Sequence, residues 1–500
     1  MFEKAGRRVF VRLLLAALIL GAATTVSAEV PPTPIPQDGT SDAPRFIGRP
    51  TRAHPLESFR VPRHPFMAAN GRSNLHDDAY MTDAYNTAGP LGRRMRVRST
   101  FQSAECASVS FDGKGRIVTI CVGVEGPKLT LMDSDSLETL ATLPLPPRNS
   151  SGTGTTPFND FAGGGYFYLD HKDRAVIPTT TRQIWIVRHQ RSQGAWEFEI
   201  VRQFNLAAEL NPQEGIVSAL PDWDGHIWFV TTKGFVGTIA PRSGRVRGVR
   251  LQDEVIANSF AVDETGGVFI VSDRALYRFE ARGSGKPRVI WHRPYDRGGR
   301  IKPGQVSRGS GTTPTLIGRG YVAITDNADP RMHVLVYRRT ADSGGREVCS
   351  EPVFRRRRGA TDNSLIAVGR NLIVENNYGY ADPRSTMNGK STMPGIARVK
   401  FSRRGRCRTV WVNPSRAPSV VPKVSLATGL VYTYTKRQRK DEEDPWYLEA
   451  ISFRTGETIF KRLAGEGLGF NNNYAPVTLD PKGRALVGAI GGLVQLRDTR

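Results

Sequence analysis

Polar side chains recur at the beginnings of β-type segments along this chain, and their types suit the binding of small polar molecules. The set combines amides, hydroxyls, carboxylates and one lysine: Thr156, Asn159, Asn258, Thr313, Asp362, Asn363, Lys423, Asn472 and Asn473. Two similar loops, SGTGTTP from Ser151 and RGSGTTP from Arg308, carry members of this set. Gathered at one place, such groups would bind a sugar, a small acid or a hard cation such as Ca²⁺. Kept apart, they would only be hydrated or form hydrogen bonds within turns.

Two further clusters of oxygen ligands follow apolar runs. Asp326 and Asp329 belong to the first, and Glu375 and Asn376 to the second. Acid and amide side chains in alternation suit Ca²⁺, so these four residues are the metal candidates. Their spacing differs from that of an EF-hand loop. The alternative interpretation is a pair of structural turns.

A polar segment with apolar anchors, HPFMAANGRSNLHDDAYMTDAY, extends from His64 to Tyr85. Its His76, Asp77 and Asp78 would act as an acid, a base or metal ligands, or else form structural hydrogen bonds. The sequence contains no nucleophile elbow, P-loop, zincin motif or dinucleotide fingerprint. Any chemistry must therefore come from residues that the fold brings together.

The elements that would bring them together are short strands in an eightfold repeat. Each copy has an apolar-alternating strand, a tight turn with Gly or Asn, a second β-forming strand, and then further β-type runs. The expected turn residues are Gly115, Gly165, Gly225, Gly266, Gly320, Asn371, Gly429 and Gly483. Four strands in roughly every 50 residues predict the blades of a single all-β propeller. We expect eight four-stranded blades, or seven if one copy is miscounted.

The eighth copy ends at the C-terminus after only three strands. The segment from Arg94 to Phe101, RMRVRSTF, has strand composition and is expected to supply the missing outer strand. Such closure covers the edges that an open ring would expose. The propeller is therefore predicted over residues 94–500, and the irregular segment 61–93 is predicted to cap its channel.

Two of these repeats resemble those of a known family. YLEAISFRTGETIFKRLAG, in the seventh copy, and LTLMDSDSLETLATL, in the first, are similar to the repeat of exported bacterial eight-bladed quinoprotein-like propellers. Phe460 stands where that repeat usually has Trp, and Phe453 where it has Asp. The resemblance implies the propeller fold and, for an oxidoreductase, pyrroloquinoline quinone (PQQ) with Ca²⁺. The residues that would then contact metal or cofactor are Glu375, Asn376, Asp362 and Lys423.

Residues 1–28 have the form of a secretory signal. Basic residues, among them Arg7 and Arg8, precede an apolar run, and Val26-Ser27-Ala28 offers a small-residue cleavage site. The arginine pair fits either a twin-arginine signal or an ordinary one. The apolar run is shorter than the roughly 20 residues of a membrane span, which favours cleavage over an uncleaved anchor. Residues 29–60 are rich in proline and are predicted to form an extended or disordered tether.

The four cysteines all follow this signal. An even number of cysteines in an oxidising compartment favours disulfides over a metal site. Proximity along the chain predicts that Cys106 pairs with Cys121 and Cys349 with Cys407.

The formal net charge of +23 is spread along the whole chain. Because no nucleic-acid motif accompanies it, no nucleic-acid partner is expected, and no membrane span is expected once the signal is removed. Three functions remain open. The first is a secreted or cell-envelope propeller that binds a small polar ligand or an envelope partner. The second is a PQQ- and Ca²⁺-dependent oxidoreductase, and the third is a Ca²⁺-dependent lactonase-like hydrolase, whose propellers usually have six blades.

Overall fold

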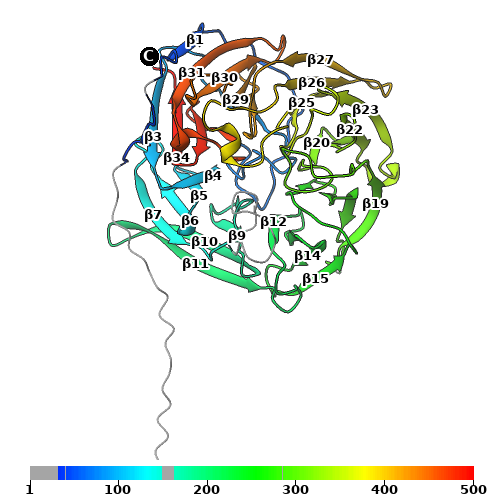
Figure 1. Cartoon of the computed structure of the whole chain (residues 1–500). Coiled ribbons are helices and arrows are strands. Elements are labelled where there is room, and N and C mark those ends of the chain that lie inside the picture. Colours follow the sequence, from blue (N-terminus) through cyan, green and yellow to red (C-terminus); the bar gives the residue numbers. More distant parts are fainter. Residues whose placement is uncertain (1–31, 40, 149–162, 284, 500) are drawn as a thin grey trace, which may run out of the picture.

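The computed structural model describes residues 32–39, 41–148, 163–283 and 285–499. In these residues eight sheets, each with four antiparallel propeller strands, surround a common axis (Figure 1). The helical residues described are three short 3₁₀ turns, at Ala341–Ser343, Pro383–Thr386 and Leu468–Phe470. The prediction of eight blades is confirmed, and the alternative of seven is wrong.

Blades 1 to 4 follow one another along the chain, each from its inner to its outer strand. Blade 1 contains β4 (Ala104–Phe111), β5 (Ile117–Gly123), β6 (Gly126–Met132) and β7 (Thr139–Pro144). Blade 2 contains β8 (Tyr168–Leu169), β9 (Ala175–Pro178), β10 (Gln183–Ser192) and β11 (Ala195–Asn205). Blade 3 contains β12 (Ile216–Pro221), β13 (Ile227–Thr231), β14 (Phe235–Ile239) and β15 (Val246–Arg250). Blade 4 contains β16 (Ala261–Val262), β17 (Val268–Val271), β18 (Ala275–Glu280) and β19 (Arg288–Pro294).

Blades 5 to 8 continue the same order. Blade 5 contains β20 (Thr315–Ile317), β21 (Tyr321–Thr325), β22 (Met332–Arg338) and β23 (Glu347–Val353). Blade 6 contains β24 (Ile366–Val368), β25 (Asn371–Glu375), β26 (Ile396–Phe401) and β27 (Cys407–Asn413). Blade 7 contains β28 (Lys423–Ser425), β29 (Leu430–Thr435), β30 (Pro445–Ser452) and β31 (Thr458–Glu466). Blade 8 contains β32 (Val477–Leu479), β33 (Ala485–Ala489), β34 (Gly492–Arg497) and β3 (Arg96–Phe101).

Strand β3 closes the ring, as the sequence predicts. It pairs antiparallel with β34 over its whole length, from Arg96 opposite Arg497 to Phe101 opposite Gly492. The first and last propeller strands are thus neighbours in one sheet. This pairing removes the open edge that blade 8 would otherwise present.

The inner hairpins turn where a residue has positive φ, and most of these residues were predicted. Five expected glycines have φ between 73° and 89°: Gly115, Gly225, Gly266, Gly429 and Gly483. In blades 5 and 6 the left-handed residues are instead Gly318 and Gly369, just before the expected positions. In blade 2 the expected turn at Gly165 is wrong, because the β8–β9 hairpin turns at Asp173, with φ of 56°. The spacing of the repeats therefore predicted the positions of the blades more accurately than the positions of the individual turn residues.

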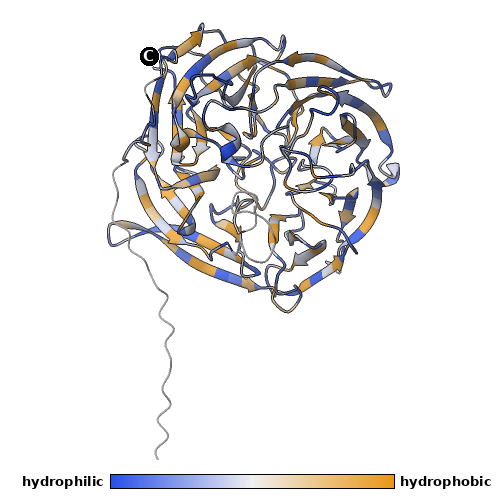
Figure 2. Cartoon of the chain, viewed as in Figure 1, coloured by the Kyte–Doolittle hydropathy of each residue, from blue (hydrophilic) through white to orange (hydrophobic). Residues whose placement is uncertain are grey.

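Each blade buries both faces, because it packs between two neighbours. In blade 3 every residue of β13 is buried, whereas every residue of the outer strand β15 is partly exposed. Figure 2 shows apolar and polar residues banded along the strands of the ring. The apolar cores run from blade to blade: one cluster joins blades 2 to 5 and another joins blades 6 to 8. This continuous packing holds the inner strands in fixed positions around the channel.

The described part of the proline-rich segment lies along the surface of blades 7 and 8. β1 (Phe46–Gly48) pairs antiparallel with β31, and the His54 and Leu56 N–H groups donate to Thr428 and Leu426 carbonyls at 2.9 and 2.8 Å. These described residues of the expected tether are therefore hydrogen-bonded to the ring. Prolines keep the backbone extended, and the residues between them retain the donors that a sheet edge can accept.

Both predicted disulfides are confirmed. Cys106 and Cys121 face each other across β4 and β5 in blade 1. Cys349 and Cys407 join β23 and β27, the outer strands of blades 5 and 6. The second bridge therefore connects two neighbouring blades, which constrains the rim of the ring.

Candidate functional site in the central channel

The cap segment, residues 64–85, runs along the inner strands of several blades. Its carbonyls accept hydrogen bonds from one inner-strand amide in each of blades 4 to 7. These bonds join Val262 N–H to Ala79 O (3.0 Å), Leu316 N–H to Tyr80 O (2.9 Å), Ala367 N–H to Thr82 O (2.9 Å) and Val424 N–H to Asp83 O (3.1 Å). The short strand β2 (Ala84–Tyr85) then pairs parallel with β28. The segment is therefore fixed to the ring by its backbone, and its side chains are held at defined positions in the channel.

A cavity of about 630 Å³ lies where the cap segment meets the blades. Six of the residues predicted from the sequence line it: His76, Asn258, Thr313, Asp362, Asn363 and Asn473. They come from the cap segment and from loops that lead into the inner strands of blades 4, 5, 6 and 8. The ring thus brings together side chains that are up to about 400 residues apart in the chain.

His76 is held by a buried charged cluster. Its Nδ1 lies 3.1 Å from Asp83 Oδ1 and 3.1 Å from Ser364 Oγ. Lys423, the first residue of β28, donates to the Asp83 carboxylate and to the Leu75 carbonyl, the latter at 2.6 Å. Burial would raise the pKa of Asp83, but Lys423 and His76 hold it below its ordinary value. Asp83 is therefore an ionised carboxylate, and His76 donates its Nδ1 proton to it.

The opposite nitrogen of the ring has no such partner. His76 Nε2 is buried and makes no hydrogen bond to any residue that the structure describes. Burial also lowers the pKa of His76, so the imidazole is neutral near pH 7. A neutral ring that donates from Nδ1 presents a lone pair at Nε2. His76 therefore offers the cavity a hydrogen-bond acceptor or a base.

Asp362 and Asn363 add further unsatisfied oxygens. Within the described residues, Oδ1 of Asn363 and both carboxyl oxygens of Asp362 are buried without a side-chain hydrogen-bond partner, and the Val306 backbone N–H is the one group that lowers the pKa of Asp362. Burial raises the pKa of Asp362 to about 8, so this group is a neutral carboxylic acid near pH 7. The Asn363 amide nitrogen donates to Glu375 Oε2 at 2.9 Å and to the Val420 carbonyl at 2.7 Å, which fixes the orientation of its Oδ1.

Several cavity residues were not predicted. Glu105, at the start of β4, accepts the Asn473 N–H at 2.7 Å, and burial raises its pKa to about 8. Tyr166 stacks on His76 with ring centroids 6.2 Å apart. Ser364, which also lines the cavity, escaped prediction, whereas Asp83 belongs to the polar segment whose His and Asp side chains were predicted to act as acid, base or metal ligands. The proximity of Ser364 to Asn363 in sequence was the available signal, but its contact with His76 depends on the closed ring.

The remaining ligand candidates take structural positions near the cavity. Asp78 accepts from Tyr80 N–H at 2.8 Å and from the Thr82 hydroxyl at 2.5 Å, and burial raises its pKa to about 7. Asp77 is buried, and its pKa is raised by burial and by Asp78. The Asn472 amide donates to the Ala475 and Gly488 carbonyls, both at 2.9 Å. The two candidates Thr156 and Asn159 lie outside the described residues.

The structure separates the four metal candidates. Asp326 accepts from the ring of His333 at 2.8 Å, whereas Asp329 is 3.5 Å from Lys302 and 41% exposed at its side chain. Glu375 accepts from Thr433 at 2.9 Å as well as from Asn363. The Asn376 amide donates to the Arg358 and Pro394 carbonyls at 3.0 and 3.1 Å. Among the described residues, no group of three or more His, Cys, Asp and Glu side chains is arranged to hold a metal ion.

Comparison with known proteins supports the fold. Quinohemoprotein alcohol dehydrogenase from Comamonas testosteroni superposes with a TM-score of 0.55, covering 88% of this chain and 82% of its own at 11% identity. The chain therefore has a quinoprotein-like propeller fold. Streptogramin B lyase aligns with a TM-score of 0.41, covering 81% of this chain and 97% of its own at 10% identity. At 11% identity the likeness to the dehydrogenase concerns the fold alone.

The sequence comparisons give no activity. No family model matches the chain. An uncharacterised protein from Archaeoglobus fulgidus is 28% identical, and the match covers 57% of this chain. It spans 61% of the length of that relative.

The residues expected at a PQQ and Ca²⁺ site do not fit those groups. Lys423 is already paired with Asp83, so it does not offer a free cation to cofactor carboxylates. Burial raises the pKa of Glu375 well above its ordinary value, and a neutral acid is a poor ligand for Ca²⁺. Asn376 uses its amide within its own loops. The chain thus shares the propeller fold without the expected cofactor contacts.

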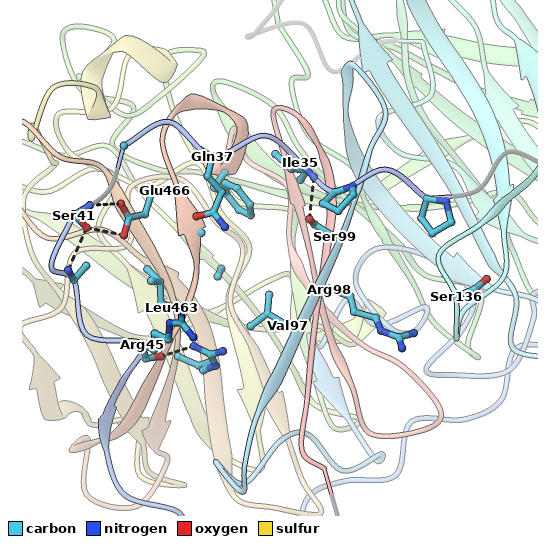
Figure 3. Close-up of a pocket in the computed structure, with 18 residues that line it drawn as sticks. Ile35, Gln37, Ser41, Arg45, Val97, Arg98, Ser99, Ser136, Leu463 and Glu466 are labelled. Atoms are coloured by element: carbon cyan, nitrogen blue, oxygen red, sulfur yellow. Dashed lines mark hydrogen bonds between the residues drawn. The ribbon is translucent and has the colours of Figure 1, made fainter.

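A second hollow, of about 780 Å³, lies at the rim of the ring and contains none of the predicted site residues (Figure 3). It lies between the N-terminal segment, β3 and β31. Ser41 donates from its hydroxyl to Glu466 at 2.6 Å, and the Ile35 N–H donates to Ser99 Oγ at 3.0 Å. These bonds fasten the segment across blades 7 and 8.

In the described part of the chain, no helix is long and apolar enough to cross a membrane.

Proposed function

We propose that this protein binds a small polar ligand, rich in O–H or N–H donors, in its channel cavity. The observation that carries the proposal is a set of buried acceptors that have no side-chain partner in the described part of the chain: His76 Nε2, Asn363 Oδ1 and the Asp362 carboxyl. A buried polar atom without a partner costs about 1–3 kcal/mol. Three such groups around one cavity are explained if a ligand supplies the missing hydrogen bonds.

The same groups favour a hydroxyl-rich ligand over a small acid or a hard cation. Lys423, the basic residue predicted to bind an acid, is neutralised by Asp83. Asp362 is held protonated by burial, which removes the negative charge that a cation would require. Imidazole, amide and neutral carboxyl groups together suit a sugar or another polyol.

The cavity also has an apolar side. Val124 is fully exposed at the β5–β6 turn, and Pro127 and Pro147 lie on the same wall. The rings of Tyr166 and Tyr474 also line the cavity. A ligand with one C–H face and several hydroxyls would match both sides.

The test is thermal unfolding of the purified full-length chain with a panel of neutral ligands, acids and CaCl₂. We expect monosaccharides or cyclitols to stabilise the chain, and acetate, succinate and Ca²⁺ to have little effect. A ligand at 100 times its Kd would stabilise the folded state by about 2.7 kcal/mol. Stabilisation by acids or Ca²⁺ alone would contradict the proposed ligand class, and no stabilisation by any compound would contradict binding.

The variant Asp362→Asn provides the matched test of location. It keeps the shape of the side chain and adds a permanent amide donor in place of the acid proton, so we expect ligand affinity to fall about tenfold, or about 1.4 kcal/mol. Thr119→Val is the control, because Thr119 Oγ1 is also buried without a partner but does not line the cavity. Equal loss of affinity in both variants would show that the cavity is not the binding site.

The folded chain should also lose stability as pH rises through the neutral range. In the unfolded chain Asp362 releases its proton near its ordinary pKa of 3.8, whereas the folded chain keeps it until about pH 8. The contribution is fully present below pH 3.8 and is lost progressively up to about pH 8. Melting temperatures at pH 5, 6, 7 and 8 should therefore fall less steeply for Asp362→Asn than for the wild type. Parallel curves would contradict the raised pKa.

We further propose that the chain acts outside the cytoplasm, in the envelope or as a secreted protein. Residues 1–28 have the composition of an export signal, and the two disulfides suit an oxidising compartment. Fractionation of cells that express the full chain, with and without residues 1–28, tests this. We expect export of the first protein and cytoplasmic retention of the second. Retention of both would contradict the proposal.

A further inference from the structure

The cluster around His76 contains a buried ion pair, which ligand binding alone does not require. Asp83 and Lys423 are both fully buried, and together they place a carboxylate against the Nδ1 side of one imidazole. Burying an ion pair costs several kcal/mol of desolvation for each ion. A hydroxyl or amide would supply an acceptor at far lower cost. The arrangement is explained by a need to fix the tautomer and orientation of His76.

We propose that the channel cavity hydrolyses a small neutral carboxylic ester, with His76 as the general base and Asp362 as the general acid. This inference rests on the proposed function, because the ester would occupy the cavity described above. Asp83 is a positioning residue, since it touches His76 and not the substrate. Lys423 keeps Asp83 ionised.

The geometry satisfies the main requirement of base catalysis. A carboxylate on one ring nitrogen keeps the proton there and leaves the lone pair on the other. His76 Nε2 holds that lone pair beside the cavity and makes no hydrogen bond to the residues described by the structure. Ser364 lies on the Nδ1 side, so its hydroxyl is placed as a partner of Asp83 and His76 and not as a nucleophile. Water is therefore the nucleophile that the site would activate.

Asp362 is placed to complete the reaction. It lies two residues before Ser364, which contacts His76, and it lines the same cavity. No described side chain hydrogen-bonds to its carboxyl oxygens, and burial raises its pKa to about 8 although the Val306 backbone N–H lowers it in part. A neutral imidazole and a neutral carboxylic acid in one cavity are the protonation states that a base and an acid need near pH 7.

The proposed step balances without a further reactant. His76 Nε2 takes a proton from water as the water oxygen attacks the ester carbonyl carbon, and the C=O π electrons move to the carbonyl oxygen. Collapse of the tetrahedral intermediate breaks the bond to the alkoxy oxygen, which takes the proton from Asp362. The products are a carboxylic acid and an alcohol. The proton on His76 returns to Asp362 through water, which restores both groups.

The charged and titratable groups near His76 set the expected pH profile. Asp83 contacts its ring, Lys423 contacts Asp83, and Asp77, Asp78 and Tyr166 lie close by in the same channel. The rate should rise as His76 loses its proton below pH 6.5, and fall as Asp362 loses its proton near pH 8. A bell-shaped profile of kcat/KM follows.

The test measures hydrolysis of ethyl acetate and ethyl butyrate by the full-length chain, followed as acid release, because an ethoxide leaving group needs the proton that Asp362 would supply. We expect His76→Gln to lower kcat/KM at least 100-fold, in the range typical of a lost general base. Asp83→Asn should lower kcat with little change in KM, and Asp362→Asn should remove the alkaline fall of the pH profile. His171→Gln, at an exposed histidine of blade 2, is the control and should match the wild type. Circular dichroism identifies any variant that fails to fold.

A second measurement does not depend on substrate choice. Diethyl pyrocarbonate acylates unprotonated imidazole, so peptide mapping at pH 6 should find His76 modified in the folded wild type and less modified in Asp83→Asn. Equal ester hydrolysis by the wild type and His76→Gln, or an unreactive His76, would overturn the inference. If polyols still stabilise the chain in that case, the proposed binding function stands and only the catalytic inference fails. If neither hydrolysis nor ligand stabilisation is found, both fail.

Discussion

Replacing Lys423 with methionine is expected to lower the free energy of unfolding by about 3–5 kcal/mol. The substitution removes the ammonium that faces Asp83, and both side chains are fully buried. Asp83 would keep only His76 and Ser364 as partners, and a buried carboxylate without its cation is strongly destabilising. Guanidinium chloride unfolding, followed by tryptophan fluorescence, measures the loss.

Two further variants distinguish the effect of breaking the buried Lys423–Asp83 pair from the effect of removing a lysine charge in general. Lys482→Met removes a surface pair with Asp135, in which both side chains are more than half exposed, and should cost at most about 1 kcal/mol. The double variant Lys423→Met with Asp83→Leu removes both buried charges and should recover much of the lost stability. A Lys423→Met chain as stable as the wild type would show that this pair does not anchor the cap segment.

Replacing Arg98 with proline is expected to open the ring. Phe101 directs its N–H outward to the Thr33 carbonyl, at 2.6 Å, so alternation places the Arg98 N–H toward β34. Proline removes that donor and leaves the carbonyl of Gln495, a buried residue, without a partner. We expect a loss of more than about 3 kcal/mol, since the unpaired carbonyl and the proline ring both weaken the closing pair.

Val97→Pro is the matched control, because alternation places the Val97 N–H on the outer side of β3. Proline is tolerated at such edge positions. The open form of Arg98→Pro should also dimerise in size-exclusion chromatography, because an unpaired strand edge accepts another chain. Equal stability of the two variants, with both monomeric, would contradict closure by β3.

The sequence was most informative where contacts are local. The blade count and the Cys106–Cys121 bridge follow from strand alternation over short distances, and the structure agrees with both. The β3 closure joins distant parts of the chain and was predicted instead from the missing fourth strand of the last copy, which the structure also confirms. The blade 2 turn was misplaced because three consecutive glycines suggested a turn, whereas Asp173 takes the left-handed position. Several residue types can take a given turn position, whereas a buried strand requires its pattern of apolar residues, so turns are harder to place from sequence than strands.

The chemistry of the channel was harder to predict. Six of the candidate residues line the cavity, because loops before inner strands converge in any closed ring. The role of Lys423 was not apparent, since its partner Asp83 is 340 residues away in the sequence. Whether a polar atom lacks a partner depends on every neighbouring blade, so the unsatisfied atoms of His76 and Asp362 became visible only in the folded ring.

The most direct test of the account is a crystal structure of the chain with the most stabilising ligand of the panel. The account predicts that the ligand lies in the channel cavity, within hydrogen-bond distance of His76 Nε2, Asn363 Oδ1 and the Asp362 carboxyl. A ligand at the rim hollow between β3 and β31, or a channel ligand that leaves these atoms without partners, would contradict it.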